Sequence, residues 1–452
     1  MRIIVLGAGE VGFDVAQMLS RESHDVIVVD EAAEPLENVR SRLDVLTIQG
    51  NGTSAAVLKQ AGADSADLLI AVTSIDEINV ISCMLADKMG ARVTVARVRS
   101  GEFSRGDSVL SAAELGIDLI IHPEDSTADE IVRLIRRASA TDVLSFGDDR
   151  LQLVGIRIGE TSPVMYRSLE DISVGAPNVQ FRVMGIQRGM RTIIPRGSER
   201  IHKNDQVFVL VRTNDFSDVA MVFGVSDAKV QDVMVLGGTQ VGARVAALLS
   251  SEKGMRVKLI ESDRAVAEEL AAELPSVLVI HGEGSDVDLL ATEGIMDMDA
   301  FIAVKNDEAS NLVTCLIAKH LGVSKTVALL STAAYIPISQ RIGIDSAVNK
   351  KRSVAAEVLR FLRGKHVLSL ATVPGLDVEV LELKAGEGSR ITRGPMSETR
   401  MPDGILIGAV VRPNDVEVAT GGTLVHEGDR VIVFALPALI ADVEKLFAGR
   451  KK

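Results

Sequence analysis

Arg2-Ile3-Ile4-Val5-Leu6-Gly7-Ala8-Gly9-Glu10-Val11-Gly12 opens the chain with a short apolar run that ends in three spaced glycines. A strand that enters Gly-x-Gly-x-x-Gly and continues as a helix is typical of dinucleotide-binding domains. Gly7 permits the tight turn, Gly9 lets a phosphate approach the backbone, and Gly12 lets the helix pack closely on the strand. The N–H groups at the start of this helix are therefore predicted to bind phosphates. The alternative is a turn of the same shape that binds nothing.

Asp30 ends the second apolar run, where dinucleotide-binding domains place an acidic residue. Its carboxylate can accept hydrogen bonds from both hydroxyls of a ribose, and its charge repels a 2′-phosphate. NAD(H) or an adenosine phosphate is therefore favoured over NADP(H). The ends of the next three apolar runs add candidates at the same edge of the sheet: Asn51, Gly52, Thr53, Thr73, Ser74 and Arg97. The alternatives are a plain turn with a helix cap at residues 50–53 and a surface ion pair at Arg97.

Residues 1–226 and 227–452 are two copies of one pattern. Gly237-Gly238-Thr239-Gln240-Val241-Gly242 aligns with the first glycine stretch, and Glu261 aligns with Asp30. So many matches in the same order indicate a duplication, and a fixed internal period is a strong guide to architecture. The sequence therefore predicts a second cleft of the same kind.

The second copy departs from the first at three positions that would face the ligand. Thr239 stands in place of the middle glycine, where its side chain would crowd a pyrophosphate. Lys305 replaces Thr73 as a positive charge that faces the cleft, and Leu329 replaces Arg97. We therefore expect two non-equivalent clefts, of which the second binds weakly, prefers another nucleotide or is only structural.

Short apolar runs alternate with helical patterns, such as Val109–Leu115, in the first part of each copy. This alternation predicts a parallel sheet buried on both faces. Shorter strands and turn residues follow, and they predict a small α+β module. The expected fold is α/β, with two Rossmann-like domains that each precede a small α+β domain. The predicted boundaries are 1–138, 142–226, 230–364 and 366–452.

Charge and composition disfavour several classes of partner. The net charge is −13 and the chain has no Trp, which argues against binding to a nucleic-acid backbone or to stacked bases. The longest apolar stretch, Val431–Ala441, is too short to span a membrane and is interrupted by Pro437. The N-terminus lacks the layout of a signal peptide. We expect a cytoplasmic protein.

No set of residues typical of catalysis accompanies the cleft. The histidines and the two cysteines, Cys83 and Cys315, lack the spacing of a metal site, and we expect both cysteines to be buried. The sequence contains neither a P-loop nor a Gly-x-Ser-x-Gly elbow. His122 aligns with Asn349, which favours a polar junction residue over a catalytic one. We expect no enzyme; the alternative is an NAD-dependent dehydrogenase, with Lys305 as its best proton donor.

These residues resemble a known family. The glycine fingerprint, the Gly50-Asn51-Gly52-Thr53 turn, the Ala71-Val72-Thr73 strand end with Asn79 downstream, and the trailing small module are similar to an RCK (KTN/TrkA-N) domain followed by an RCK-C (TrkA-C) domain. Two such units in one chain resemble the cytosolic regulatory subunits of Trk-type potassium uptake systems. The resemblance covers essentially the whole chain.

The resemblance implies binding of NAD(H), with ATP and ADP as competing regulatory ligands. It assigns the first site to Gly7, Ala8, Gly9, Glu10, Val11, Gly12, Asp30, Asn51, Gly52, Thr53, Thr73, Ser74 and Arg97. It assigns a second site to Gly237, Gly238, Thr239, Gln240, Val241, Glu261, Lys305 and Asn306. It also implies a homotetramer that forms an eight-domain ring beneath a TrkH- or TrkG-type membrane potassium channel, on the cytoplasmic face of the inner membrane. An RCK subunit of another cation transporter is the alternative.

Overall fold

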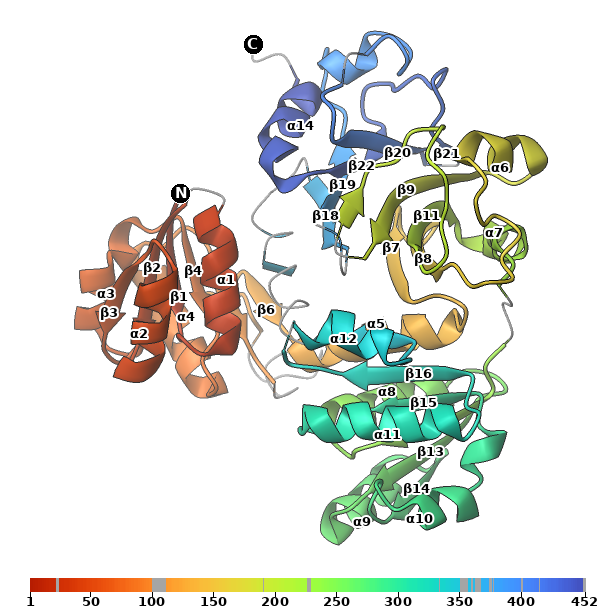
Figure 1. Cartoon of the computed structure of the whole chain (residues 1–452). Helices are drawn as coiled ribbons and strands as arrows, with labels where there is room; N and C mark the ends of the chain where they lie inside the picture. The colour runs from red at the N-terminus through yellow and green to blue at the C-terminus, as the bar shows by residue number, and fades with distance from the viewer. Residues whose placement is uncertain are drawn as a thin grey trace. The chain divides into compact units, whose positions relative to one another are not determined.

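The computed structural model contains four β-sheets, two parallel and two antiparallel (Figure 1). It describes residues 1–21, 24–99, 111–189, 191–225, 229–332, 334–349, 357–358, 361, 367–373, 376, 378–399, 401–413 and 415–449. The predicted boundary residues 226, 364, 366 and 452 lie outside these ranges, as does most of 350–366. The α/β fold class is confirmed, with parallel Rossmann-like sheets followed by antiparallel ones.

The first parallel sheet has the strand order β3-β2-β1-β4-β5-β6. Its strands are β1 (Arg2–Leu6), β2 (Asp25–Asp30), β3 (Leu46–Gln49), β4 (Leu68–Ala71), β5 (Thr94–Arg97) and β6 (Leu119–Ile121). Its helices are α1 (Glu10–Arg21), α2 (Ala33–Arg42), α3 (Ala55–Ala61) and α4 (Asp76–Met89). The chain runs outward in opposite directions from β1 and β4, so a crevice opens beyond the carboxyl end of β1. The glycine turn begins at that point.

The second parallel sheet repeats the order as β14-β13-β12-β15-β16-β17. Its strands are β12 (Asp232–Leu236), β13 (Arg256–Glu261), β14 (Val277–His281), β15 (Ala300–Ala303), β16 (Lys325–Leu329) and β17 (Ser346–Val348). Its helices are α8 (Gln240–Ser250), α9 (Arg264–Glu273), α10 (Val287–Thr292), α11 (Glu308–His320) and α12 (Tyr335–Arg341). The duplication in the sequence is therefore a duplication of strand topology.

The two antiparallel sheets also share one topology. The first has the order β10-β9-β11-β8-β7, and the second has β18-β19-β22-β20-β21. The first contains β7 (Asp142–Phe146), β8 (Leu151–Arg157), β9 (Phe181–Arg188), β10 (Arg191–Ile193) and β11 (Gln206–Arg212), with helices α6 (Leu169–Gly175) and α7 (Phe216–Phe223). The second contains β18 (Val367–Thr372), β19 (Glu379–Lys384), β20 (Ile405–Val411), β21 (Val416–Val418) and β22 (Arg430–Ala435), with helix α14 (Ile440–Phe447).

The two antiparallel sheets bury apolar side chains against each other. Leu153, Phe208 and Leu210 of the first sheet form one cluster with Val380 and Phe434 of the second. All five side chains are almost completely buried. Burial of this kind stabilises a protein by roughly 25 cal/mol for each Å² of apolar surface removed from water. The paired sheets therefore share a single hydrophobic core.

The chain divides into two compact units. One comprises Met1–Thr127 and Asn349–Leu362, and the other comprises Ala128–Val348 and Arg363–Lys452. The division falls inside α5 (Pro123–Arg136). The largest core of the second unit joins the later part of α5, the first antiparallel sheet and the second parallel sheet.

The helix predicted at residues 109–115 is wrong over the part that the structure describes. Residues 112–116 form a turn, in which the N–H of Leu115 bonds to the carbonyl of Ser111 at 3.1 Å. Gly116 then adopts a left-handed φ of 65°, which ends the turn. The side chain of Glu114 also accepts the N–H of Ser111 at 2.8 Å. Residues 109 and 110 lie outside the described ranges.

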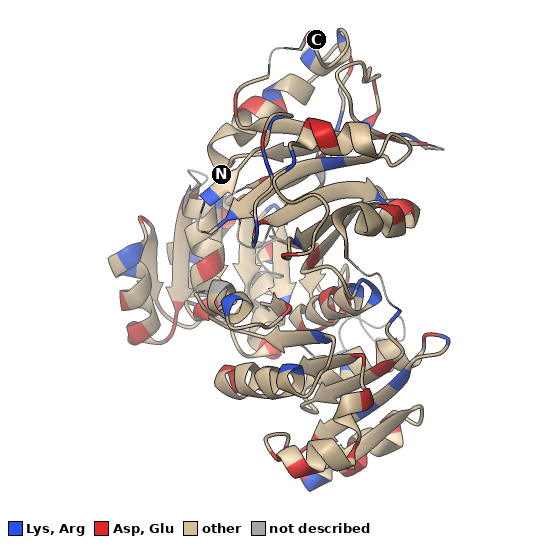
Figure 2. Cartoon of the chain, turned by 45° about the vertical axis from the view of Figure 1, so that its right-hand side comes forward, with Lys and Arg blue, Asp and Glu red and all other residues tan. Residues whose placement is uncertain are grey.

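Charged residues of both signs are spread over the helices and loops of the chain (Figure 2). Among the residues that the structure describes, no helix is long and apolar enough to cross a membrane.

Candidate functional site

The glycine turn after β1 has the geometry that each glycine was predicted to provide. Gly7 has a φ of 101°, and its N–H bonds to the carbonyl of Val29 at 2.8 Å. A Cβ on Gly12 would lie 1.8 Å from the Gly7 carbonyl oxygen, so only glycine fits there. A Cβ on Gly9 would have no atom of the described residues within 4 Å. Gly9 therefore faces open space, which is where a phosphate group would approach.

Asp30 lies against the glycine turn at the end of β2. Its Oδ2 atom accepts the N–H of Ala8 at 2.6 Å, and its Oδ1 atom accepts the N–H of Ala32 at 2.8 Å. These two bonds fix the orientation of the carboxylate beside the turn. Because each carboxylate oxygen can accept two hydrogen bonds, both still have capacity for ligand hydroxyls.

The turn after β3 is held by its own asparagine. The Oδ1 atom of Asn51 accepts the N–H of Thr53 at 2.8 Å and its hydroxyl at 2.6 Å. Ser82 of α4 donates its hydroxyl to the carbonyl of Gly52 at 2.9 Å. Ser54, at the N-cap of α3, forms no side-chain cap bond. The alternative of a turn is thus observed here, whereas the helix cap is not.

The ends of β4 and β5 are joined by a buried asparagine, Asn79 of α4. Its Oδ1 atom accepts the N–H of Thr73 at 2.9 Å and the hydroxyl of Thr73 at 2.7 Å. Its Nδ2 atom donates to the carbonyl of Thr73 at 3.1 Å and to that of Arg97 at 2.9 Å. Asn79 therefore sets the spacing of two strand ends that carry predicted site residues. The neighbouring carbonyl of Ser74 accepts a hydrogen bond from Arg99, which the sequence analysis did not single out.

Arg97 is half buried at the end of β5. Its Nε atom is buried and has no hydrogen-bond partner among the described residues. Burial lowers the pKa of Arg97, while the carboxylate of Glu124 acts in the opposite direction and Arg99 lowers the pKa further. A guanidinium that has lost water without gaining a bond at Nε favours an anionic ligand.

In the second cleft, Thr239 occupies the position of Gly9 and caps α8. Its Oγ1 atom accepts the N–H of Gly242 at 3.2 Å and donates to the carbonyl of Val304 at 2.9 Å. The cap therefore uses an N–H of the kind that would bind a phosphate. Val241 is buried in the core, while Gln240 is exposed at the start of the helix.

Glu261 and Lys305 are both held by bonds within the second cleft. Glu261 accepts the N–H groups of Gly238 at 2.5 Å and Asp263 at 2.8 Å. Burial raises the pKa of Glu261, but the bonds from Asp263, Gly238 and Ser262 outweigh it and leave the pKa below its ordinary value. The Nζ atom of Lys305 is paired with Glu283 at 2.8 Å.

The pair between Lys305 and Glu283 changes how the second cleft is interpreted. The positive charge that the sequence predicted at Lys305 is present, but a carboxylate neutralises it. Glu283 stands where the first cleft has Asn51, so the substitution of both residues together produces the pair. Asn306, the next residue, is exposed.

The residues weighed for catalysis or metal binding differ in burial: the two cysteines are buried, whereas His122 and Lys305 are half-buried. The Nε2 atom of His122 is buried and has no hydrogen-bond partner among the described residues. Cys83 and Cys315 are fully buried, as predicted, and burial raises the pKa of both thiols. Within the described ranges, no group of three or more His, Cys, Asp or Glu side chains could hold a metal ion.

The two halves each match two family models. The TrkA-N domain matches residues 3–123 and 233–350, and the TrkA-C domain matches residues 153–224 and 380–448. The tandem order expected from the sequence is therefore confirmed.

Curated relatives extend over the full length. A Trk system potassium uptake protein TrkA homolog 1 of Methanosarcina mazei is 33% identical over 454 residues, covering 99% of this chain and all of the relative. The Trk system potassium uptake protein TrkA of Halomonas elongata is 34% identical over 452 residues, covering 99% and 98%.

A solved structure shares the fold of the whole chain. The GsuK channel bound to NAD superposes with a TM-score of 0.61 at 18% identity, over 99% of this chain and 79% of that one. Together with the domain matches and the full-length relatives, the two parallel and two antiparallel sheets show that this chain belongs to the family of Trk system potassium uptake proteins TrkA.

Proposed function

We propose that this chain is a cytosolic regulatory subunit that binds NAD(H) and adenine nucleotides and gates a Trk-type membrane potassium uptake channel. The observation that carries the proposal is the first cleft. There the glycine turn, the oriented Asp30 carboxylate and the Nε atom of Arg97, which has no partner among the described residues, lie at the crevice edge of one parallel sheet. Membership of a potassium uptake family supplies the transport role.

The first cleft suits a nucleotide in three respects. Open space at Gly9 admits the phosphates, and the N-terminus of α1 provides N–H groups for them. Asp30 is placed to accept ribose hydroxyls, and its charge disfavours the 2′-phosphate of NADP(H). The GsuK channel, which shares the fold, is described as bound to NAD. We therefore assign the first set of site residues, from Gly7 to Arg97, to NAD(H) and to ATP or ADP in competition.

The second cleft is the weaker nucleotide site in this proposal. Thr239 fills the phosphate position with a capped helix end, and the Lys305–Glu283 pair must open before Lys305 can meet a ligand. Glu261 remains available for a ribose. Different affinities at the two clefts would let one chain respond to two nucleotide concentrations.

Assembly into a ring is supported by exposed apolar residues at equivalent places in the two halves. Ile81 of α4 is 45% exposed, and Val313 of α11 is 54% exposed. Exposed apolar side chains that recur by duplication favour contacts between like domains. We propose a homotetramer, whose tandem domains supply eight positions in a ring beneath a TrkH- or TrkG-type channel.

Gating requires that the ring has two shapes and that the nucleotides distinguish them. A ligand shifts such an equilibrium only by its difference in affinity for the two shapes. NAD(H) and ATP differ in the groups beyond the shared adenosine, so their contacts near Arg97 and Ser74 would differ. The ring shape, and with it the channel gate, would then follow the bound nucleotide.

Titration calorimetry tests the site. Wild type, Asp30→Ala and Glu261→Gln are titrated with NADH, ATP and NADPH, and the mass of the assembly is recorded. We expect tight NADH and ATP binding by a tetramer, a large loss in Asp30→Ala and a small change in Glu261→Gln. Unchanged affinity of Asp30→Ala for both nucleotides would contradict the site assignment.

A flux assay tests the transport role. The chain is added to vesicles that contain the channel, and potassium uptake is followed with and without nucleotide. Nucleotide-dependent flux in wild type that is lost in Asp30→Ala supports the regulatory role. Hydride transfer from NADH to an added substrate would instead favour a dehydrogenase.

A further inference from the structure

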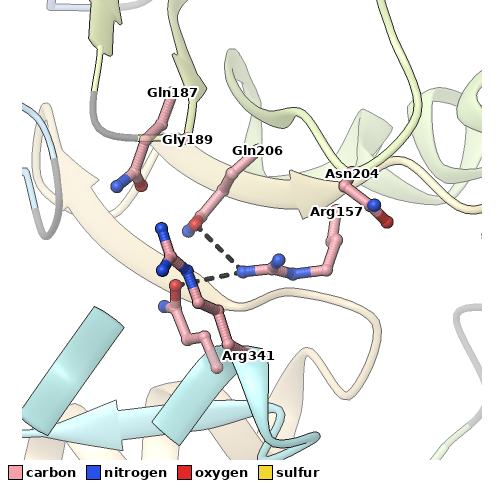
Figure 3. Close-up of a pocket in the computed structure, with 7 residues that line it drawn as sticks. Arg157, Gln187, Gly189, Asn204, Gln206 and Arg341 are labelled. Atoms are coloured by element: carbon pink, nitrogen blue, oxygen red, sulfur yellow. Dashed lines mark hydrogen bonds between the residues drawn. The ribbon is translucent and has the colours of Figure 1, made fainter. Parts of the chain in front are cut away.

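A pocket of about 360 Å³ lies within the second unit (Figure 3). The first antiparallel sheet contributes one wall, and the end of α12 contributes the other. The side chains that line it are Arg157, Gln187, Asn204, Gln206, Gln340 and Arg341.

The pocket lies at the opposite edge of the second parallel sheet from its cleft. In a parallel α/β sheet, each helix returns the chain from the carboxyl ends of the strands to their amino ends. Helix α12 ends with Gln340 and Arg341, so both residues lie at the edge of the sheet where the strands begin. Glu261 and Gly238 lie at the carboxyl-end edge, where the cleft opens. The pocket is therefore a separate site.

The chemistry of the lining points to an anion. Every lining side chain is an amide or a guanidinium, so the lining itself carries two positive charges, and the carboxylates of Asp142 and Asp345 act electrostatically on Arg157. Guanidinium and amide N–H groups match phosphate and carboxylate oxygens in geometry and charge.

Arg157 is held in position for such a ligand. Its Nη2 atom donates to the Oε1 atom of Gln340 at 3.0 Å and to that of Gln206 at 3.5 Å. Gln206 is buried, and its Nε2 atom donates to Asp142 at 2.5 Å and to Thr141 at 2.8 Å. These bonds fix the amide of Gln206 with its oxygen toward Arg157. The guanidinium is thus anchored through Nη2, beside the space that a ligand would fill.

Arg341 completes the site from the other wall. Its side chain extends from α12 toward Gln187 and Gln206 (Figure 3). Its backbone belongs to the last turn of the helix, and the residue is exposed. An anion between Arg157 and Arg341 would therefore contact the antiparallel module and the second parallel domain at once.

We propose that this pocket binds a small polyanion, with its charge on phosphate or carboxylate oxygens. By joining Arg157 to Arg341, the ligand stabilises the contact between the first antiparallel module and the second parallel domain. A ligand bound at this site would therefore influence how the two domains pack, independently of nucleotide.

Calorimetry on the full chain tests the proposal with pyrophosphate and citrate as probes. Titrations are made with and without saturating NADH, because pyrophosphate could also enter the glycine turns. The variants are Arg157→Gln and Arg341→Gln. Arg393→Gln, which removes the same charge from an exposed position in the last antiparallel module, is the matched control.

We expect one probe ion per chain in wild type and in Arg393→Gln, and about tenfold weaker binding in each pocket variant. Binding of pyrophosphate alone identifies a phosphate ligand, binding of citrate alone identifies a carboxylate ligand, and both outcomes support the site. No binding of either probe at millimolar concentration, or equal binding by Arg341→Gln and wild type, overturns it. NADH affinity should be the same in all these proteins, so failure here is distinguishable from failure of the nucleotide site.

Discussion

Asn79 donates a hydrogen bond from its side-chain amide to the backbone carbonyl of Arg97 at 2.9 Å. The same amide binds the backbone of Thr73, so one fully buried side chain links the ends of two neighbouring strands. In the second half, Asn311 links Lys305 to Leu329 in the same way, at 2.8 Å and 2.9 Å. In each half, an asparagine from a helix therefore holds the two strand ends at the edge of the cleft together, although the residues that face the ligand have changed.

Replacing Asn79 with Leu should destabilise the first unit and weaken nucleotide binding. The change preserves size but leaves the N–H of Thr73 and the carbonyl of Arg97 without their partner. Each buried polar group that loses its hydrogen-bond partner lowers the free energy of unfolding by about 1–3 kcal/mol. Denaturant unfolding and NADH titration measure the two effects. Asn311→Leu is the control: it should destabilise the chain similarly and leave tight NADH binding intact. If Asn79→Leu binds NADH as wild type does, the linkage does not shape the site.

Alanine at Gly9 should impair nucleotide binding, whereas alanine at Gly12 should impair stability. The Cβ of Gly9→Ala meets no atom in the part of the chain that the structure describes, so the variant should fold with unchanged stability. Its methyl group should exclude a phosphate and lower nucleotide affinity. The Cβ of Gly12→Ala would overlap the carbonyl of Gly7 at 1.8 Å, so this variant should unfold at a lower temperature. Thermal unfolding and NADH titration separate the two. Equal stability of both variants would contradict the assigned geometry.

Removing the cap at Thr239 should improve the second cleft. Thr239→Gly frees the N–H of Gly242 and removes the side chain from the phosphate position. Glycine is a tolerated N-cap residue, so the cost in stability should be only a few tenths of a kcal/mol. NADH titration of Thr239→Gly in an Asp30→Ala background, with the first cleft disabled, measures the gain. Affinity no higher than that of Asp30→Ala alone would show that another feature closes the cleft.

Lys325 should make stability depend on pH above neutrality. It is fully buried, and its Nζ atom donates to the carbonyl of Ala140 and to Ser346 at 2.9 Å. Burial lowers its pKa to about 8, while Asp345 and Asp142 raise it and Lys319 lowers it further.

The direction in which stability changes with pH follows from proton binding to Lys325. Between about pH 8 and 10.5 the unfolded chain holds a proton on this lysine that the folded chain lacks, so stability rises with pH through that window. Relative to Lys325→Met, wild type should gain up to about 3 kcal/mol across it. Unfolding temperatures measured from pH 7 to 10.5 give the difference, with Lys59→Met as a control for loss of an exposed charge. Parallel curves for wild type and Lys325→Met would refute the shift.

Several features of the site could not be foreseen because they depend on pairs of residues far apart in the chain. The charge at Lys305 was predicted, but its neutralisation by Glu283 requires β15 and the turn after β14 to lie together. Thr239 was predicted to crowd a phosphate, and the structure adds that it caps the helix. The role of Asn79 carries no local signal in the first half alone. Its recurrence as Asn311 is the signal that could have identified it.

The sequence by itself determined the duplication, the order of strands and helices, and the chemistry of the glycine turn. These follow from local rules: apolar spacing sets the type of element, and only glycine can adopt the backbone of Gly7 or fit beneath Gly12. Tertiary structure alone decided which polar groups meet. The face-to-face packing of the antiparallel sheets, the bond from Asn79 to Arg97 and the pocket between Arg157 and Arg341 join segments distant in sequence. Hydrogen bonds and ion pairs act over a few ångströms, so their partners are fixed only once the sheets have packed.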